Sequence, residues 1–147
     1  MQKKSLSGPK ADSLRDAVVD GLLQGLGAGA IMAAFLLAVG LFTPQSARTV
    51  LFALARAAET SPAAVVAAHF AVAAVYGIVW GLLYRTVLAG RSLPVWMAGL
   101  LFGGALWLVG RLLLPGSSIA PGPIFAGAHL VYGLALGLLT DSALTHR

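Results

Sequence analysis

The segment VYGIVWGLLYRTVL, at Val75–Leu88, decides the fold because the chain repeats it as VYGLALGLLTDSAL at Val131–Leu144. Seven of the fourteen positions are identical, and both copies begin with Val-Tyr-Gly. A histidine precedes each copy, His69 before the first and His129 before the second, in surroundings that are otherwise apolar. Because membrane proteins are often built from internal structural repeats, this recurrence predicts a tandem duplication of a helical hairpin.

The composition places this repeat in a membrane. Of the 147 residues, 59% are hydrophobic and 10% are charged, and the mean hydropathy is +0.88, whereas soluble domains are roughly half apolar and a quarter charged. A bilayer core of about 30 Å requires about 20 apolar helical residues. Four segments meet this requirement: 21–42, 63–84, 95–114 and 123–140. The predicted fold class is therefore an all-α membrane protein with four transmembrane helices.

The chain divides into two parts in this prediction. Residues 1–20 form a cytoplasmic N-terminal tail and the start of the first helix, and residues 21–147 form the four-helix transmembrane domain. Cytoplasmic flanks carry an excess of Lys and Arg. One side holds Lys3, Lys4, Lys10, Arg15, Arg85, Arg91 and Arg147, and the other holds Arg48, Arg56 and Arg111. This difference predicts that both termini lie in the cytoplasm.

The first and third predicted spans correspond more faintly than the second and fourth. The segment GAIMAAFLLAVGLFTP, which begins at Gly29, aligns with GLLFGGALWLVGRLLLP, which begins at Gly99. Because one complete hairpin separates the copies, the two halves run in the same direction. They are expected to be related by an axis along the membrane normal.

Glycines recur at steps of about four along the spans, which places them on single helix faces. Lipid gives helices no hydrophobic drive to associate, so close approach along small-residue faces must hold them together. The glycines predicted to lie at helix contacts are Gly21, Gly25, Gly29, Gly77, Gly81, Gly99, Gly103, Gly133 and Gly137. We expect them to pack the helices within one bundle, with packing against another subunit as the alternative.

Five polar residues are candidates for a cofactor site. His69 and His129 lie about 10 Å from the start of their helices at 1.5 Å per residue, Tyr76 and Tyr132 follow on nearby faces, and Arg111 reaches a similar level. Ionisable residues within a membrane span usually face the interior or a cavity, which makes them functional candidates.

These five residues allow two interpretations. In the preferred one, each imidazole hydrogen-bonds a neighbouring helix and the arginine extends to the interface. In the other, the two imidazoles bind haem b or a chlorophyll-like pigment, or the cluster hydrogen-bonds a quinone or a lipid headgroup. A metal site for zinc is not expected, because zinc requires a third protein ligand and none is available.

Several classes of function find no support in the sequence. The chain has no cysteine, no serine nucleophile within a span, no phosphate-binding Gly-rich loop and no Asp or Glu in the middle of a span. These absences argue against an enzyme and against a proton-coupled exporter. Basic residues form no dense run, so nucleic acid is not an expected partner.

Four segments carry a resemblance to a known family. They are GLGAGAIMAAF in the first span, AHFAVAAVYG in the second, GLLFGGALWLVGRLLLP in the third and GAHLVYGLALG in the fourth. In these segments the chain resembles the small uncharacterised four-helix inner-membrane proteins of bacteria of the YagU type. The resemblance implies a protein of the bacterial inner membrane without an established activity, and it transfers no site residues.

The sequence therefore predicts a non-catalytic membrane protein that acts through helix packing. Its expected partners are the lipid bilayer and other membrane subunits or further copies of itself, as a homo-oligomer or as an accessory subunit of a larger complex. The alternative is a protein that binds a cofactor or a small ligand through His69 and His129.

Overall fold

The computed structural model of the protein describes residues 9–42, 56, 59–113 and 122–145. In chain order its elements are α1 (Pro9–Phe42), α3 (Pro62–Leu83), the π-helical turn η1 (Tyr84–Leu88), α4 (Val95–Leu113) and α5 (Pro123–Thr145). No β-strand occurs within these ranges. Four helices are long and apolar enough to cross a membrane, which confirms the predicted all-helical class and the number of candidate spans.

The helices extend beyond several of the predicted span boundaries. α1 is helical from Pro9 onward, so much of the predicted N-terminal tail is part of the first helix. α5 continues past residue 140 to Thr145. Leu114, the predicted end of the third span, and residues 1–8 lie outside the described residues. These differences arise because polar residues end a membrane span, whereas a helix ends only where its backbone hydrogen bonds end.

Local sequence signals fix the start of α3. Ser61 has an extended backbone, and its side-chain oxygen accepts a hydrogen bond from the N–H of Ala64 at 3.2 Å. Pro62 follows in the first turn, where its missing N–H leaves no bond unmade. The other end of α3 widens into η1, in which the N–H of Ala89 donates to the carbonyl oxygen of Tyr84 at 2.8 Å.

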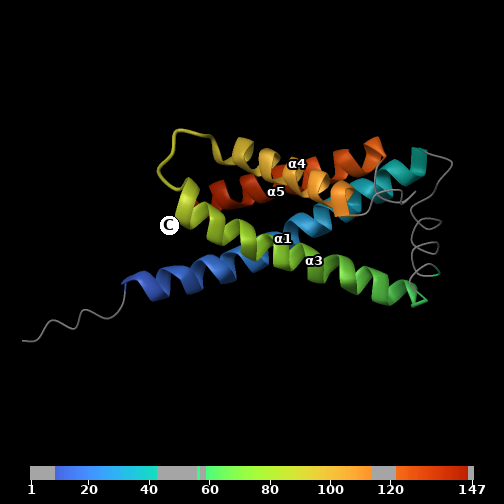
Figure 1. Ribbon diagram of the computed structural model, residues 1–147, viewed down its shortest axis with the longest axis horizontal. Coiled ribbons are helices and arrows are strands. Elements are labelled where there is room, and N and C mark those ends of the chain that lie inside the picture. The colour runs from blue at the N-terminus through green and yellow to red at the C-terminus, as the bar shows by residue number, and fades with distance from the viewer. Residues whose placement is uncertain (1–8, 43–55, 57–58, 114–121, 146–147) are drawn as a thin grey trace, which may run out of the picture.

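The helices form two antiparallel hairpins, α1 with α3 and α4 with α5 (Figure 1). α1 also joins the hairpins, because it crosses α3 and then runs beside α5. Its contact with α5 includes Phe35, whose ring lies 3.5 Å from where a Cβ of Gly127 would stand. The described part of the chain is therefore a bundle in which α1 packs against the second helix of each hairpin.

Small residues let the paired helices approach until their backbones touch. A Cβ built on Gly77 would overlap the backbone of Gly21 and would lie 2.5 Å from the Cα of Gly25. A Cβ on Gly133 would overlap Gly99 and would lie 2.9 Å from the Cα of Gly103. This close approach provides the van der Waals contact that holds helices together in lipid.

Larger side chains fill the space between the hairpins. Trp80 and Leu136 are fully buried, and Tyr132 is nearly so. The ring of Phe102 from α4 lies 5.4 Å from the Trp80 ring, centroid to centroid, so Trp80 of α3 contacts the second hairpin directly. The core therefore combines glycine contacts within each hairpin with aromatic contacts between hairpins.

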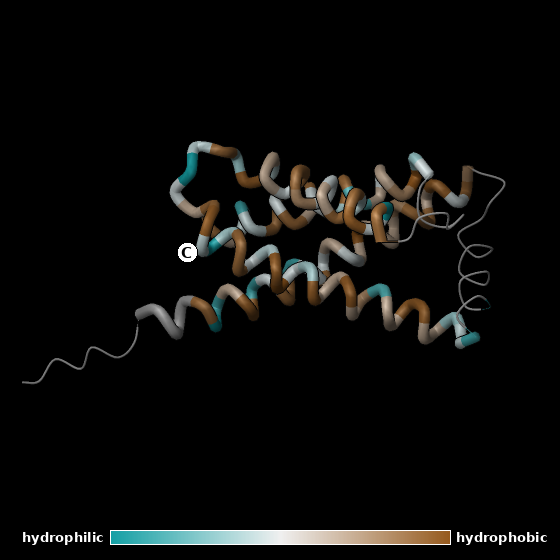
Figure 2. Tube along the Cα trace, viewed as in Figure 1, coloured by the Kyte–Doolittle hydropathy of each residue, from teal (hydrophilic) through white to brown (hydrophobic). Residues whose placement is uncertain are grey.

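Apolar residues recur along the length of all four helices (Figure 2), and many of the large ones are exposed on the outside of the bundle. Leu37 of α1 is 61% exposed, Leu101 of α4 is 64% exposed, and Phe42 at the end of α1 is 88% exposed. Exposure of so many large apolar side chains is unfavourable in water but not in hydrocarbon. The surface thus agrees with a multi-pass membrane protein.

Candidate functional site

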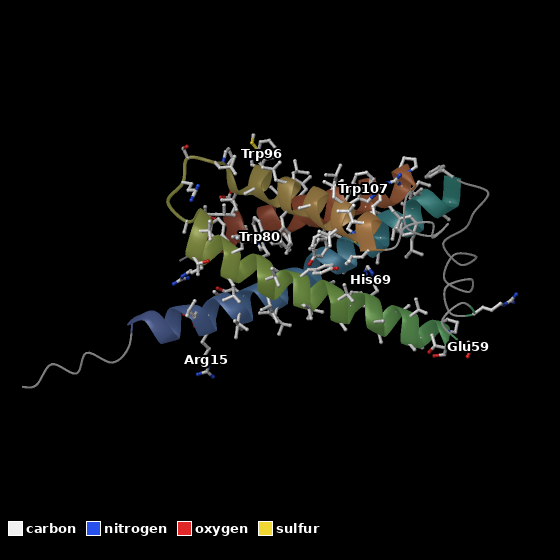
Figure 3. All side chains as sticks on the ribbon, viewed as in Figure 1. Arg15, Glu59, His69, Trp80, Trp96 and Trp107 are labelled. Atoms are coloured by element: carbon white, nitrogen blue, oxygen red, sulfur yellow. The ribbon has the colours of Figure 1, made fainter. Side chains whose placement is uncertain are left out.

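His69 projects from α3 towards α1. Its Nε2 atom donates a hydrogen bond to the backbone carbonyl oxygen of Gly29 at 3.2 Å, and the side chain is half-buried (Figure 3). A carbonyl oxygen only accepts, so Nε2 must carry the proton in this arrangement. The imidazole therefore links the two helices of the first hairpin, and its remaining lone pair is on Nδ1.

His129 makes a different bond. Its Nδ1 atom donates to the carbonyl oxygen of Phe125, one turn earlier in α5, at 2.8 Å. The lone pair is then on Nε2, the arrangement typical of a histidine that binds a metal, whose other nitrogen donates to a backbone carbonyl. The two histidines consequently differ in their tautomers, and only His69 connects two helices.

The two tyrosines lie in or against the core. The Tyr132 hydroxyl donates to the carbonyl oxygen of Ala73 at 2.7 Å, which joins α5 to α3. Tyr76 is half-buried and packs against the same core residues. Because His69 precedes Ala73 by one turn and His129 precedes Tyr132 by nearly one turn, the two histidines lie at a similar level of the bundle.

Arg111 is exposed and lies in the last turn of α4, near the same end of the bundle as the histidines. Within the described ranges, no three side chains of His, Cys, Asp or Glu lie together in a way that could hold a metal ion. The arrangement thus brings His69, His129, Tyr76 and Tyr132 to one region of the bundle and gives three of them hydrogen bonds to backbone carbonyls.

All nine glycines that were predicted from the sequence to lie at helix contacts do so in the structure. At each of them, a Cβ would approach an atom of the paired helix more closely than real Cβ atoms do. Gly27, Gly104, Gly110 and Gly127 have more room, since a Cβ on any of them would meet nothing within 3.0 Å. The step of four along a helix is the signal that distinguishes the two groups.

The contacts give the two hairpins a common pattern. Gly99 faces the Gly133 carbonyl as Gly21 faces the Gly77 carbonyl, and Gly103 faces Gly133 as Gly25 faces Gly77. This register aligns GLLQG, which begins at Gly21, with GLLFG, which begins at Gly99. It differs from the sequence alignment of Gly29 with Gly99, because apolar residues are so common in spans that several registers match.

The sequence did not reveal a hydrogen-bonded link across three helices. Trp80 of α3 donates from Nε1 to the Thr140 hydroxyl of α5 at 2.9 Å. The Thr140 oxygen also lies 2.8 Å from Oε1 of Gln24 on α1 and 2.8 Å from the Leu136 carbonyl oxygen, either of which can accept its single proton. This link is buried, and unlike the histidine bonds it connects side chains to one another.

A pocket that contains two charged side chains opens beside this link, at the end of the bundle opposite the histidines. We call it the Asp20 pocket; its volume is about 240 Å³. α1, η1 and α5 all contribute to its lining. The polar residues in that lining are Asp20, Gln24, Tyr84, Arg85 and Thr140. In the sequence, this pocket is indicated only by the placement of Asp20 and Arg85 near one boundary of the predicted spans.

Comparison with models of protein families, with curated proteins and with solved structures finds no match to this chain. The resemblance to proteins of the YagU type therefore stays a prediction, and function is argued from the geometry.

Proposed function

We propose that the protein is a non-catalytic, multi-pass protein of the bacterial inner membrane that acts through helix packing, as a homo-oligomer or as an accessory subunit of a larger complex. The observation that carries this proposal is that the interior polar side chains form hydrogen bonds with the helix backbones. His69, His129 and Tyr132 each donate to a backbone carbonyl. His69 and Tyr132 thus hold neighbouring helices together, whereas the His129 bond stays within α5. The extensive apolar surface is available for contacts within the membrane.

In this proposal the bundle derives from a duplicated hairpin. The equivalent contacts of Gly21 with Gly77 and of Gly99 with Gly133 support that origin. Both termini lie in the cytoplasm, which places the Asp20 pocket at the cytoplasmic end and the histidines towards the outer leaflet. The excess of Lys and Arg on the side of the termini supports this orientation.

Purification in a mild detergent, followed by native mass determination and an absorption spectrum on the same sample, tests the proposal. We expect a colourless protein in a particle heavier than one 15.0 kDa chain, either a multiple of that mass or a complex with a stoichiometric second subunit. A single chain that stays alone in detergent and also in nanodiscs would contradict the proposal.

One observation favours the alternative of a cofactor site. His129 leaves Nε2 available beside the bundle core, as a metal-ligating histidine does. A haem b with two axial histidines would also need His69 to give up its bond to Gly29, whereas a pigment with one axial ligand would not. Absorbance that vanishes in His129→Ala would establish the alternative, and its response to His69→Ala would distinguish haem b from a chlorophyll-like pigment.

A further inference from the structure

The Asp20 pocket lies at the level where the apolar helices end. The candidate span that contains α3 ends at Leu88, within η1, and the span of α4 begins at Val95. The pocket is lined by Tyr84 and Arg85, near the end of the first of these spans, and by Gly90 in the connection between them. It therefore lies in the region where lipid headgroups meet the hydrocarbon core.

Two opposite charges from different helices line the pocket. Asp20 comes from α1 and is half-buried, and Arg85 comes from η1 and is exposed. A guanidinium group binds phosphate through paired N–H donors, and a carboxylate accepts hydrogen bonds from an ammonium group. A ligand that carries both a phosphate and an ammonium would match these two side chains.

Three neutral polar residues and six small or apolar residues make up the rest of the lining. Tyr84 and Gln24 line the same pocket, and the Gln24 carbonyl oxygen lies 2.8 Å from the Thr140 hydroxyl oxygen. The two N–H donors of the Gln24 amide are the groups of this side chain that can bind a phosphate oxygen. Buried packing around Trp80 and Thr140 fixes this wall of the pocket in place.

The size of the pocket and its apolar edge limit the class of ligand. A volume of about 240 Å³ suits a small headgroup rather than a whole lipid. Leu144 lines one side and is 47% exposed, so it offers an apolar surface beside the pocket. Acyl chains attached to a bound headgroup could remain in the bilayer along this side.

We propose that the Asp20 pocket binds the phosphoethanolamine headgroup of a membrane phospholipid, with the phosphate on Arg85 and Gln24 and the ammonium on Asp20. Phosphatidylcholine lacks an N–H to donate to Asp20, and phosphatidylglycerol lacks the cation. The site is therefore selective for phosphatidylethanolamine. This proposal is independent of the proposed packing function, since a monomer and an oligomer would both carry the pocket.

Native mass spectrometry of the full chain tests the proposal. The detergent-purified protein is exposed to equal amounts of phosphatidylethanolamine, phosphatidylcholine and phosphatidylglycerol with identical acyl chains. We expect bound phosphatidylethanolamine to exceed each of the other lipids by roughly tenfold, because a hydrogen bond to a charged group is worth on the order of a tenfold change in affinity. Asp20→Asn and Arg85→Gln should each remove most of this preference.

Matched variants test whether the effect belongs to the pocket. Asp141→Asn and Arg91→Gln make the same changes of charge at exposed positions that do not line the pocket, and both should keep the preference. Equal binding of phosphatidylethanolamine and phosphatidylcholine would overturn the proposal. A preference that survives both pocket variants, or that falls equally in the matched variants, would overturn it too.

A final comparison separates a lipid from a soluble ligand with the same chemistry. Free O-phosphoethanolamine is added in excess to the protein with its bound lipid. We expect it to displace little lipid, because the acyl chains contribute apolar binding that the free compound lacks. Tight binding of the free compound together with no lipid preference would assign the pocket to a water-soluble zwitterion and overturn the lipid assignment. Circular dichroism of each variant verifies that the helices are intact.

Discussion

α4 and α5 approach closely at Gly133 because the side chain of glycine is a single hydrogen atom rather than a methyl group. A methyl group there would overlap the backbone of Gly99 and would lie 2.8 Å from the Gly103 nitrogen. Neither obstacle is the end of a flexible side chain, so the helices would have to separate. The same holds at Gly77, whose neighbours are the backbones of Gly21 and Gly25.

Gly133→Ala should lower the free energy of unfolding by about 1–3 kcal/mol, the usual cost of inserting a methyl group into a packed core. Gly104→Ala is the matched control, because its nearest neighbour would be a Leu130 side-chain carbon at 3.8 Å. Thermal or denaturant unfolding in one detergent measures both variants. Equal stability of the two would mean that the close contact at Gly133 is absent in the membrane.

The Thr140 hydroxyl is the central atom of the link across three helices. Thr140→Val keeps the shape of the side chain but removes the acceptor for Trp80, leaving a buried indole N–H without a partner. We expect a loss of about 1–3 kcal/mol in the free energy of unfolding, and Thr140→Ser should lose much less. Trp fluorescence during unfolding measures this loss. If Thr140→Val unfolds with the same free energy as the original protein, the link does not contribute to stability.

Sequence reasoning at the residue scale succeeded where spacing along one helix carried the signal. The glycines at steps of four could be found in this way. The partners of Trp80, Thr140 and Gln24 could not, because they are single polar residues on three helices far apart in the chain. Nor could the sequence tell that His69 bonds another helix while His129 bonds its own.

Among the elements, α1 has the most varied contacts. It packs against α3 through Gly21 and Gly25, and against α5 through Gln24 and Phe35. Hydropathy predicted this helix as a span, but it could not show that one helix would contact both hairpins. That information depends on which faces meet, and periodicity of small residues identifies only one face at a time.

The absence of cysteine makes the contact of α1 with α5 testable by crosslinking. The double variant Phe35→Cys with Gly127→Cys should react efficiently with a short bifunctional thiol reagent in membranes, because the two positions face each other. Leu37→Cys with Gly127→Cys is the control, since Leu37 is largely exposed. After proteolytic cleavage between the hairpins, crosslinked fragments stay together and are detected by their gel mobility. Equal crosslinking yields for the two pairs would contradict this arrangement of α1.

The π-helical turn at the end of α3 could not be predicted from sequence patterns. Its residues, Tyr84–Leu88, form the end of the repeated segment, whose counterpart continues as regular α-helix to Thr145. A π turn requires only one extra residue per turn and has no distinctive composition. The helix starts at Pro62 and Pro123 were easier to predict, because proline is favoured in the first turn of a helix.

For the molecule as a whole, the orientation in the membrane can be tested with single cysteines. Thr60→Cys, just before α3, should react with a membrane-impermeant maleimide in intact cells if both termini are cytoplasmic. Ser92→Cys, in the connection between α3 and α4, should react only after the cells are opened. Both positions are exposed. The reverse pattern of labelling would show that the bundle has the opposite orientation.

The division into two hairpins has a consequence for the way the protein is synthesised. At about 5–20 residues per second, the ribosome needs several seconds to make α4 and α5 after α3 is complete. During this interval α1 and α3 can already meet along their glycines, since neither needs the later helices for that contact. Trp80 and Gln24, however, must wait for Thr140, which lies near the end of the chain. The hairpin of α1 and α3 thus enters the bilayer before the hydrogen-bond partner of Trp80 and Gln24 has been made. Insertion of α5 then supplies that partner.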